Sequence, residues 1–396
     1  MHHPLRKQLS ELKLVFSGYP DFVYSKTKNL HLEGIPVFVY HTIDPQIFES
    51  HLLFLKENNY KTLSIHEFYD ILLSKSELRE NKSVLLTIDD ARSSVWRFAF
   101  PLLKKYQMKA TVFIIPGLTV DDEHCRKNLE DVWKGRIELQ NVNEIDSEDN
   151  TLCNWNEIIG MYNSGLVSIE SHTLFHSEVF KNFKFFDFIT RDKPFLPYNF
   201  VGSPYLSFFS TGGRFLPEQF FGLPLFESAP LMLCGPKLNF SNEFINECKE
   251  FYNYNISHNS SNNNWKKEIR RFIKETSDKK KYFNIETHSG KDVYEDLKKA
   301  REIIQNKLDK NAGNHLCLPW TIGNNDTINI LKELEIKSCF WGVLKDKTIN
   351  KPGDNPYFIT RIKNDFIFRL PGIKRKNLFS IYNYKLKRRI SKEPVF

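Results

Sequence analysis

The sequence predicts an α/β fold built on a largely parallel sheet, open or closed into a barrel. Apolar runs of strand length alternate along the chain with amphipathic segments of helix length. This alternation is typical of parallel strands joined by helical crossovers. The chain has 396 residues, 41% of them hydrophobic, so it can bury the large core that such a fold needs.

The first strand and the two helices after it have clear boundary signals. The run IPVFVYH, residues 35–41, is typical of a buried strand. Asp44, followed by Pro45 at the first helical position, predicts a helix start. Ser64 and Glu67 have the spacing of a capping box, which predicts the start of a second helix.

A strand, a helix and a second strand follow between residues 83 and 117. After the apolar run SVLLTI, Trp96, Phe100 and Leu103 fall on one helical face, and ATVFIIPG ends the unit. Later helices and strands are expected in the segments NWNEIIGMYNSG, LVSIESH, DVYEDLKKAREIIQNKL, HLCLPW, DTINILKELEI and SCFWGV.

Two stretches interrupt the alternation. Residues 118–150 are acidic and loop-like, and residues 178–280 are rich in Phe, Pro and Gly, with an Asn/Ser tract, NYNISHNSSNNN, typical of an exposed loop. We therefore expect an N-terminal extension (1–34), a barrel domain (35–345) interrupted by the insertion 178–280, and a basic C-terminal segment (346–396).

Positive charge is concentrated at the C-terminal end. The net charge is +8, and the 11 Lys and Arg from Arg361 onward, against two acids, give that end +9 and leave residues 1–360 at −1. The surplus indicates either contact with an anionic lipid or a phosphate-bearing carrier, or a solvated terminal face. No nucleic-acid-binding module accompanies the charge, so nucleic acid is not an expected partner.

Export and membrane insertion are not predicted. No apolar run approaches the roughly 20 residues of a membrane span, and the N-terminus has no apolar stretch of signal length. The six cysteines are scattered without CxxC spacing, which is typical of reduced thiols. We expect a cytoplasmic protein whose basic segment is either a peripheral contact with the inner membrane face or a solvated surface.

Two adjacent carboxylates, Asp89 and Asp90, stand at the end of the apolar run SVLLTI. Like charges repel, and an unpaired carboxylate is costly to bury. The pair therefore needs a cation, hydrogen-bond donors or a shared proton.

Two histidines, His172 and His176, end a second apolar run at a spacing that can bring both imidazoles to one side of a turn. Alone, they are weak evidence for a metal site and are better interpreted as satisfied polar residues at a strand end. In a parallel fold, however, the C-terminal strand ends gather on one face, so the histidines should meet the acid pair. Two imidazoles and one carboxylate leave a metal with free positions, and the second carboxylate can act as a base.

The segments LLTIDDARSSVWRFAFPLLKKYQMKATVFIIPG and WNEIIGMYNSGLVSIESHTLFH resemble the first two motifs, TFDDG and H-[ST]-x-x-H, of the polysaccharide deacetylase family (carbohydrate esterase family 4). The resemblance covers most of residues 35–345 outside the inserts. It implies a distorted (β/α) barrel with a long insertion and hydrolytic removal of an acetyl group from an N-acetylated sugar.

The resemblance also implies the roles of the site residues. Asp89 would be the general base, and Asp90, His172 and His176 would bind a divalent metal. Zinc is the expected metal, and cobalt, nickel, iron or manganese suit the same ligands. The oxyanion of the reaction would rest on the metal and on a backbone N–H of the 116–118 turn or of the strand end at Pro319.

The sequence departs from the family pattern at three points. Ala91 replaces the Gly after the acid pair, and Pro319 and Trp320 stand where the third motif has an Arg that orients the base. Trp320 is either a wall for the sugar or part of the core. The late Leu-x-His acid has no counterpart, so His41 is the candidate acid for the leaving amine, or a hydrogen-bonded neighbour of the acids.

These observations predict a metal-dependent hydrolase that removes an N-acetyl group from a cell-envelope polysaccharide or from its lipid- or nucleotide-linked precursor. One alternative is a hydrolase of another C–N bond, such as a formamide or a cyclic amide. The other is a non-catalytic glycan-binding relative. Bound metal with turnover separates both enzymes from the third class, and a panel of substrates separates the two enzymes.

Overall fold

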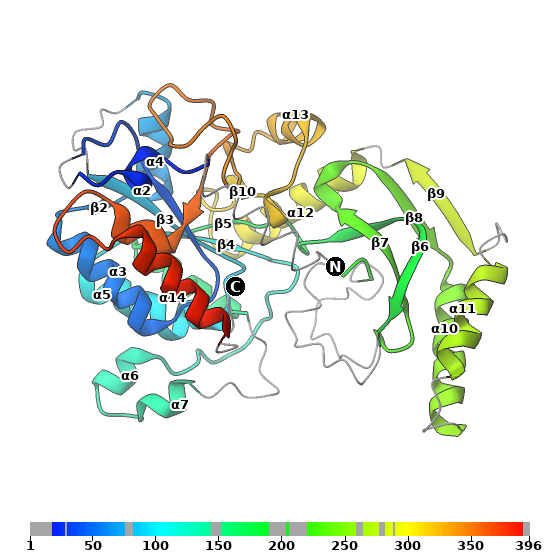
Figure 1. Ribbon diagram of the computed structural model, residues 1–396. Coiled ribbons are helices and arrows are strands. Elements are labelled where there is room, and N and C mark those ends of the chain that lie inside the picture. Colours follow the sequence, from blue (N-terminus) through cyan, green and yellow to red (C-terminus); the bar gives the residue numbers. More distant parts are fainter. Residues whose placement is uncertain are drawn as a thin grey trace.

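The computed structural model describes residues 18–27, 30–75, 82–143, 152–189, 203–205, 220–258, 264–276, 282–287 and 290–390. Within them the chain forms a parallel sheet wrapped by helices, and the insertion forms a smaller lobe beside the sheet (Figure 1). The predicted α/β class is confirmed.

The main sheet is parallel and curled. Its strand order is β11-β10-β5-β4-β3-β1-β12, with β2 paired to β3, and every pair in it is parallel. The carboxyl ends of these strands therefore meet at one edge, as in a distorted (β/α) barrel. The strands are β1 (Val37–Tyr40), β2 (Lys61–Thr62), β3 (Ser83–Asp89), β4 (Ala110–Ile114), β5 (Val167–Ser171), β10 (His315–Cys317), β11 (Ser338–Phe340) and β12 (Ile362–Lys363).

The segment after β11 bridges the two edges of this sheet. Ile359 pairs in parallel with Phe340 of β11, and Ile362 pairs in parallel with Phe38 of β1. The expected domain boundary at residue 345 is therefore wrong, because the basic segment begins by pairing with barrel strands. It then continues through the 3₁₀ helix η6 (Asn364–Arg369) to the helix α14 (Leu378–Ile390).

Helices cover the sheet and begin where the sequence predicts (Figure 1). The Asp44 carboxylate accepts a hydrogen bond from the Ile47 N–H at 2.8 Å at the start of α3. Ser64 and Glu67 form the predicted capping box of α4. The helices that pack around the sheet are α3 (Pro45–Glu57), α4 (Ile65–Leu72), α5 (Phe100–Tyr106) with the preceding π-helical turn η1 (Val95–Ala99), α8 (Trp155–Asn163), α12 (Lys291–Lys307) and α13 (Asn325–Glu333).

Part of the predicted acidic loop is helical. It contains α6 (Leu129–Trp133) and α7 (Leu139–Asn143). Asn128 caps α6 in a capping box with Asp131, a start signal that the acidic composition of the stretch obscured. Residues 144–151 lie outside the described residues.

The insertion folds around an aromatic core, which it shares with Ile115, Leu118 and Leu152 from outside the insertion. Its antiparallel strand pairs are β6 (Glu178–Phe188) with β7 (Pro224–Pro230), and β8 (Pro236–Phe240) with β9 (Phe283–Thr287), and its helices are α10 (Asn242–His258) and α11 (Asn264–Thr276). Phe180, Tyr205, Phe226 and Phe244 are buried in this core. The tract expected as an exposed loop is helical up to His258, and residues 259–263 lie outside the described residues.

A short 3₁₀ helix, η4 (Leu231–Leu233), joins the insertion lobe to the barrel. Asn324 and Thr327, at the start of α13, donate side-chain hydrogen bonds to the carbonyls of Leu233 and Met232. Leu231 is buried with residues of α12 and α13. The lobe is therefore fixed against these two helices.

The described part of the N-terminal extension packs on the barrel. Phe22 and Val23, in α2 (Asp21–Tyr24), are buried in the main core. Arg369 donates a hydrogen bond from its Nε to the Val23 carbonyl at 2.7 Å. Residues 1–17 lie outside the described residues. None of the described helices is long and apolar enough to span a membrane.

Candidate active site

The acid pair lies where the chain turns sharply out of the sheet. Asp89 is the last residue of β3, and Asp90 and Ala91 have positive φ values of 69° and 51°. Two successive left-handed residues are unfavourable for side chains other than glycine. The turn separates the two carboxylates, so that they have different partners although they are adjacent in the sequence.

Arg361 holds Asp89 by a two-point contact. Its Nη1 and Nη2 donate to Oδ1 and Oδ2 of Asp89 at 2.6 and 2.9 Å, and its Nε donates to the Trp341 carbonyl at 2.9 Å. Burial alone would raise the pKa of Asp89, but Arg361, His172 and His41 together hold it below its usual value. Asp89 is therefore an ionised, fixed carboxylate at neutral pH.

A turn after β5 places the two histidines together. The His172 Nδ1 lies 2.8 Å from the Cys317 carbonyl, and because a carbonyl only accepts, Nδ1 carries the proton and the Nε2 lone pair is free. The rings of His172 and His176 meet edge to face with centroids 4.7 Å apart. Burial lowers the pKa of His176 to about 3, with a further contribution from His172.

Several hydrogen bonds fix this histidine turn, which we define as residues 172–176. The Leu174 carbonyl accepts from the Gly117 N–H at 2.9 Å, and the Leu174 N–H donates to the Asp296 carboxylate at 2.9 Å. The His176 N–H donates to the Thr173 hydroxyl at 3.0 Å. The N–H and the carbonyl of Leu174, at the centre of the turn, are thus both bound by residues outside the turn.

Asp90, His172 and His176 converge as ligands for a metal ion should. One ligand atom from each lies within 4.8 Å of the other two, and all three residues are buried. The His176 Nδ1 is buried without a hydrogen-bond partner among the described residues, which is unfavourable unless something else binds there. Two imidazoles and a carboxylate suit a divalent transition metal, so the residues fit the expected group.

A second group, Asp89, His172 and Cys317, also lies within 4.8 Å, but it fits a metal less well. Both oxygens of Asp89 accept hydrogen bonds from Arg361. Burial raises the pKa of the Cys317 thiol well above its usual value, whereas a metal binds the thiolate. The Asp90 group is therefore the candidate metal site.

The other predicted site residues also reach this edge of the sheet. The His41 Nε2 lies 3.8 Å from Oδ2 of Asp89, at the end of β1. Trp320 packs edge to face on His176 with ring centroids 4.2 Å apart, and its φ of 50° marks a sharp turn next to the buried Pro319. The structure thus brings all seven predicted residues to one region.

The 116–118 turn cannot supply the expected oxyanion donor. The Gly117 N–H donates to Leu174 and the Leu118 N–H donates to Ile115, while Pro116 has no N–H. At the other candidate position, the Trp320 N–H makes no hydrogen bond within the described part of the chain. The strand end at Pro319 is therefore the remaining candidate.

Sequence reasoning missed Arg361, Arg92 and Asp296. Arg92, which follows the acid pair, lies 3.3 Å from Oδ2 of Asp90 and donates to the Thr42 hydroxyl at 2.9 Å. Arg361 was counted with the basic tail, although it lies between apolar residues in FITRIK, a pattern that indicates a buried strand end. Asp296 lies on the apolar face of α12, and that position was the signal that could have found it.

A curled parallel sheet with an acid pair and two histidines at its carboxyl edge defines a (β/α) barrel of the deacetylase type. Residues 77–191, which carry both motifs, match the family model described as polysaccharide deacetylase. This stretch of the chain is therefore similar to the polysaccharide deacetylase family.

Named relatives share the same part of the chain. YxkH, a candidate polysaccharide deacetylase of Bacillus subtilis (strain 168), is 35% identical over 98 residues, 23% of this chain and 34% of YxkH. The poly-beta-1,6-N-acetyl-D-glucosamine N-deacetylase of Staphylococcus aureus (strain MSSA476) is 27% identical over 133 residues, 34% of this chain and 37% of that protein. The matches thus span about a third of the length of these relatives.

Solved structures with a partial likeness include a de-N-acetylase and the protein IcaB. A de-N-acetylase from Aggregatibacter actinomycetemcomitans aligns with a TM-score of 0.47 and 18% identity, over 83% of this chain and 94% of that chain. IcaB from Ammonifex degensii aligns with a TM-score of 0.46 and 18% identity, over 86% of this chain and 96% of that chain.

Proposed function

We propose that this protein is a metal-dependent N-deacetylase that hydrolyses the acetamido group of a sugar in a cell-envelope polysaccharide or its precursor. The observation that carries the proposal is the division of roles between two adjacent acids. Arg361 fixes Asp89, whereas Asp90 converges with His172 and His176. The match of residues 77–191 to the polysaccharide deacetylase family model supports the same reaction class.

The residues of the chain supply the proton transfers. Asp89, ionised and fixed, accepts the proton of the attacking water, and His41 beside it is placed to protonate the departing amine. Burial lowers the pKa of His41 against the opposing effect of Asp89 and Asp90, so its ring is neutral at rest and can take up a proton during the reaction.

The remaining residues bind and orient. Asp90, His172 and His176 would hold a divalent metal, which would lower the pKa of its bound water and polarise the acetyl carbonyl. The Trp320 N–H is placed to donate to the oxyanion, and the indole next to His176 forms a wall for the sugar ring. Zinc suits the ligands, as do cobalt, nickel, iron and manganese.

An acetate-release assay with metal control tests the proposal. Purified protein should release acetate from N-acetylglucosamine oligomers, lose the activity after chelation and regain it with zinc or cobalt. The Staphylococcus aureus relative, named as a poly-beta-1,6-N-acetyl-D-glucosamine N-deacetylase, makes a β-1,6-linked oligomer the first substrate to try. Turnover of a formamide or cyclic amide alone would favour the second class of enzyme, and metal-free binding of glycan without turnover would favour the non-catalytic relative.

We further propose that α14 and the chain before it contact the anionic, cytoplasmic face of a membrane, where a lipid-linked precursor would be met. Phe379 and Ile373 are 79% and 59% exposed, and exposed apolar side chains among basic residues are typical of interfacial segments. Lys385 of α14 is not expected to contact the membrane, because it pairs with Asp365 at 3.0 Å and is mostly buried.

Vesicle binding tests this contact. Full-length protein should bind vesicles that contain phosphatidylserine, release them at high salt, and bind less after Lys387→Gln, Arg388→Gln and Arg389→Gln, since each basic residue contributes about 1 kcal/mol near an anionic surface. The control variant neutralises Lys291, Lys298 and Lys332, which are exposed on α12 and α13. Equal loss in both variants, or binding that salt does not weaken, would contradict a specific contact through α14.

A further inference from the structure

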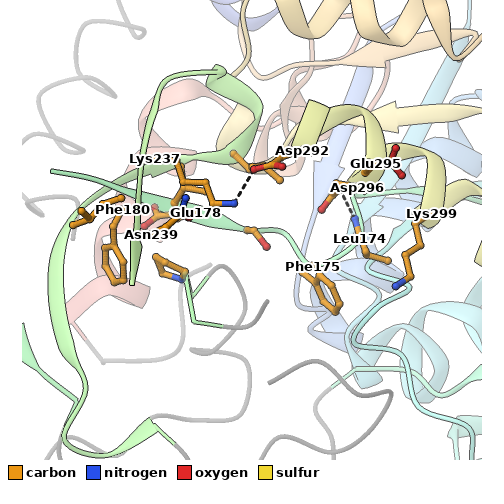
Figure 2. A pocket seen from close by; sticks show the side chains of 15 residues that line it. Leu174, Phe175, Glu178, Phe180, Lys237, Asn239, Asp292, Glu295, Asp296 and Lys299 are labelled. Carbon is orange, nitrogen blue, oxygen red and sulfur yellow. Dashed lines mark hydrogen bonds and ion pairs between the residues drawn. The ribbon is translucent and has the colours of Figure 1, made fainter. Parts of the chain in front are cut away.

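A cavity lies where the insertion lobe meets helix α12 (Figure 2). It has a volume of about 400 Å³, which is in the range of sites that bind small molecules. Its walls come from three places that are distant in the sequence: the histidine turn and the residues after it, strands β6 and β8 of the lobe, and the exposed edge of α12.

The cavity carries more negative than positive charge. Its acids are Glu178, Asp292, Glu295 and Asp296, and its lysines are Lys237 and Lys299. Lys237 pairs with Asp292 at 2.7 Å and links β8 to α12 at one side of the cavity (Figure 2). The remaining groups are three carboxylates and one ammonium, an excess that favours a cationic ligand.

Asp296 is the buried acid of this cavity. Its side chain is 7% exposed, and Oδ2 accepts one hydrogen bond, from the Leu174 N–H at 2.9 Å. Oδ1 has no partner within the described residues. Burial raises the pKa of Asp296 to about 7, and the Leu174 N–H offsets only part of that rise. Oδ1 keeps access to the cavity, so a cationic ligand there can pair with it directly.

The cavity also shares a wall with the candidate active site. Leu174 and Phe175 belong to the histidine turn, and Ser177 follows His176 directly. Phe175, which is partly exposed, adds aromatic surface to this wall (Figure 2), and such a ring can pack on the C–H face of a sugar. None of the candidate catalytic or metal-ligating residues lines the cavity, so a glycan that occupied both sites would have to span the histidine turn.

We propose that the cavity binds an already deacetylated sugar residue of the glycan, whose ammonium substituent, left by removal of the acetyl group, pairs with Asp296 and Glu295. This inference rests on the proposed function, because the cationic amino sugar is the product of that reaction. The enzyme would then hold a deacetylated residue while it acts on a neighbour, and partly deacetylated chains would be better ligands than fully acetylated ones.

Calorimetric binding to the metal-free, full-length protein tests the proposal without any turnover. The probes are a glucosamine trisaccharide, its fully N-acetylated counterpart, and the diamine putrescine. The amino trisaccharide should bind about tenfold or more tightly than either of the others, because a hydrogen bond to a charged group in a buried site is worth that much. Equal binding of the acetylated trisaccharide or of putrescine would overturn the proposal.

Matched variants locate the binding. Asp296→Asn removes the charge while its amide oxygen can still accept the Leu174 N–H, so the turn should stay in place and affinity for the amino trisaccharide should fall about 10- to 100-fold. Glu302→Gln, an exposed position on the same helix, should change nothing. Equal effects of the two variants would contradict the site. If the protein bound the amino trisaccharide as expected but released no acetate, the result would count against the proposed reaction and not against the proposed binding site.

Discussion

Asp89→Asn should leave metal binding unchanged and reduce acetate release by about 10²- to 10⁴-fold, the contribution of a general base. The amide has nearly the shape of the carboxylate but cannot accept the proton of water. Turnover and metal content, measured on the same preparation, check both parts of this result.

The adjacent acid provides the matched control. Asp90→Asn should lose metal content as well as activity, because Asp90 converges with His172 and His176 whereas Asp89 is bound by Arg361. If both variants kept the same metal occupancy, the assignment of base and ligand would be wrong.

Replacing Arg361 should have the second largest effect. Arg361→Met leaves Asp89 buried without its guanidinium, which should lower the free energy of unfolding by about 3–5 kcal/mol. Arg361→Lys keeps a charge but not the two-point contact. Its free energy of unfolding should therefore fall less than that of Arg361→Met, so the variant should remain folded and its kinetics can be measured. In both variants the pKa of Asp89 rises, because burial is then opposed less strongly.

The pH dependence separates a role in the reaction from a role in folding. A base with a raised pKa stays protonated to higher pH, so the acid limb of kcat/KM should move to higher pH in Arg361→Lys. Arg369 is a useful control, since it is buried and donates to the carbonyls of Val23, Ser25 and Lys376. Arg369→Met should lower stability without moving the acid limb, and an equal movement in both variants would count against the positioning role of Arg361.

These predictions share one structural cause. The proposed base, its arginine and the proposed metal ligands are fixed by contacts between strand ends, not by local sequence. Preorganised groups of this kind contribute to catalysis because they need not reorganise during the reaction. Even modest shifts in β12 or in the histidine turn should therefore reduce turnover more than stability.

Local signals in the sequence were reliable for helix starts. Capping residues such as Asp44 and Ser64 mark helix starts because their side chains satisfy nearby N–H groups, and the structure has both caps. The sequence alone predicted that the acids and the histidines lie close together, because parallel strands place their carboxyl ends at one edge. That rule depends only on strand order and direction, which the alternation of apolar runs indicates.

The overall charge of a segment gave a wrong prediction where that segment also contains a short strand or helix. Residues from Arg361 onward are basic overall, which hid the short strand that closes the barrel. The stretch 118–150 is acidic overall, which hid the capped helix α6. In the insertion, aromatic residues indicated packing, but not that they would form a second core.

The sequence by itself determined the α/β class, the acid pair, the two histidines and the family resemblance, because each depends on spacing within a short stretch. Only the tertiary structure decided which residue orients the base: Arg361 lies 272 residues from Asp89 along the chain. The tertiary structure likewise decided that Asp296 supports the histidine turn, although Leu174 of that turn lies 122 residues earlier in the chain. Such pairs form only when the sheet closes and the lobe docks on α12, and no local periodicity encodes contacts over that separation.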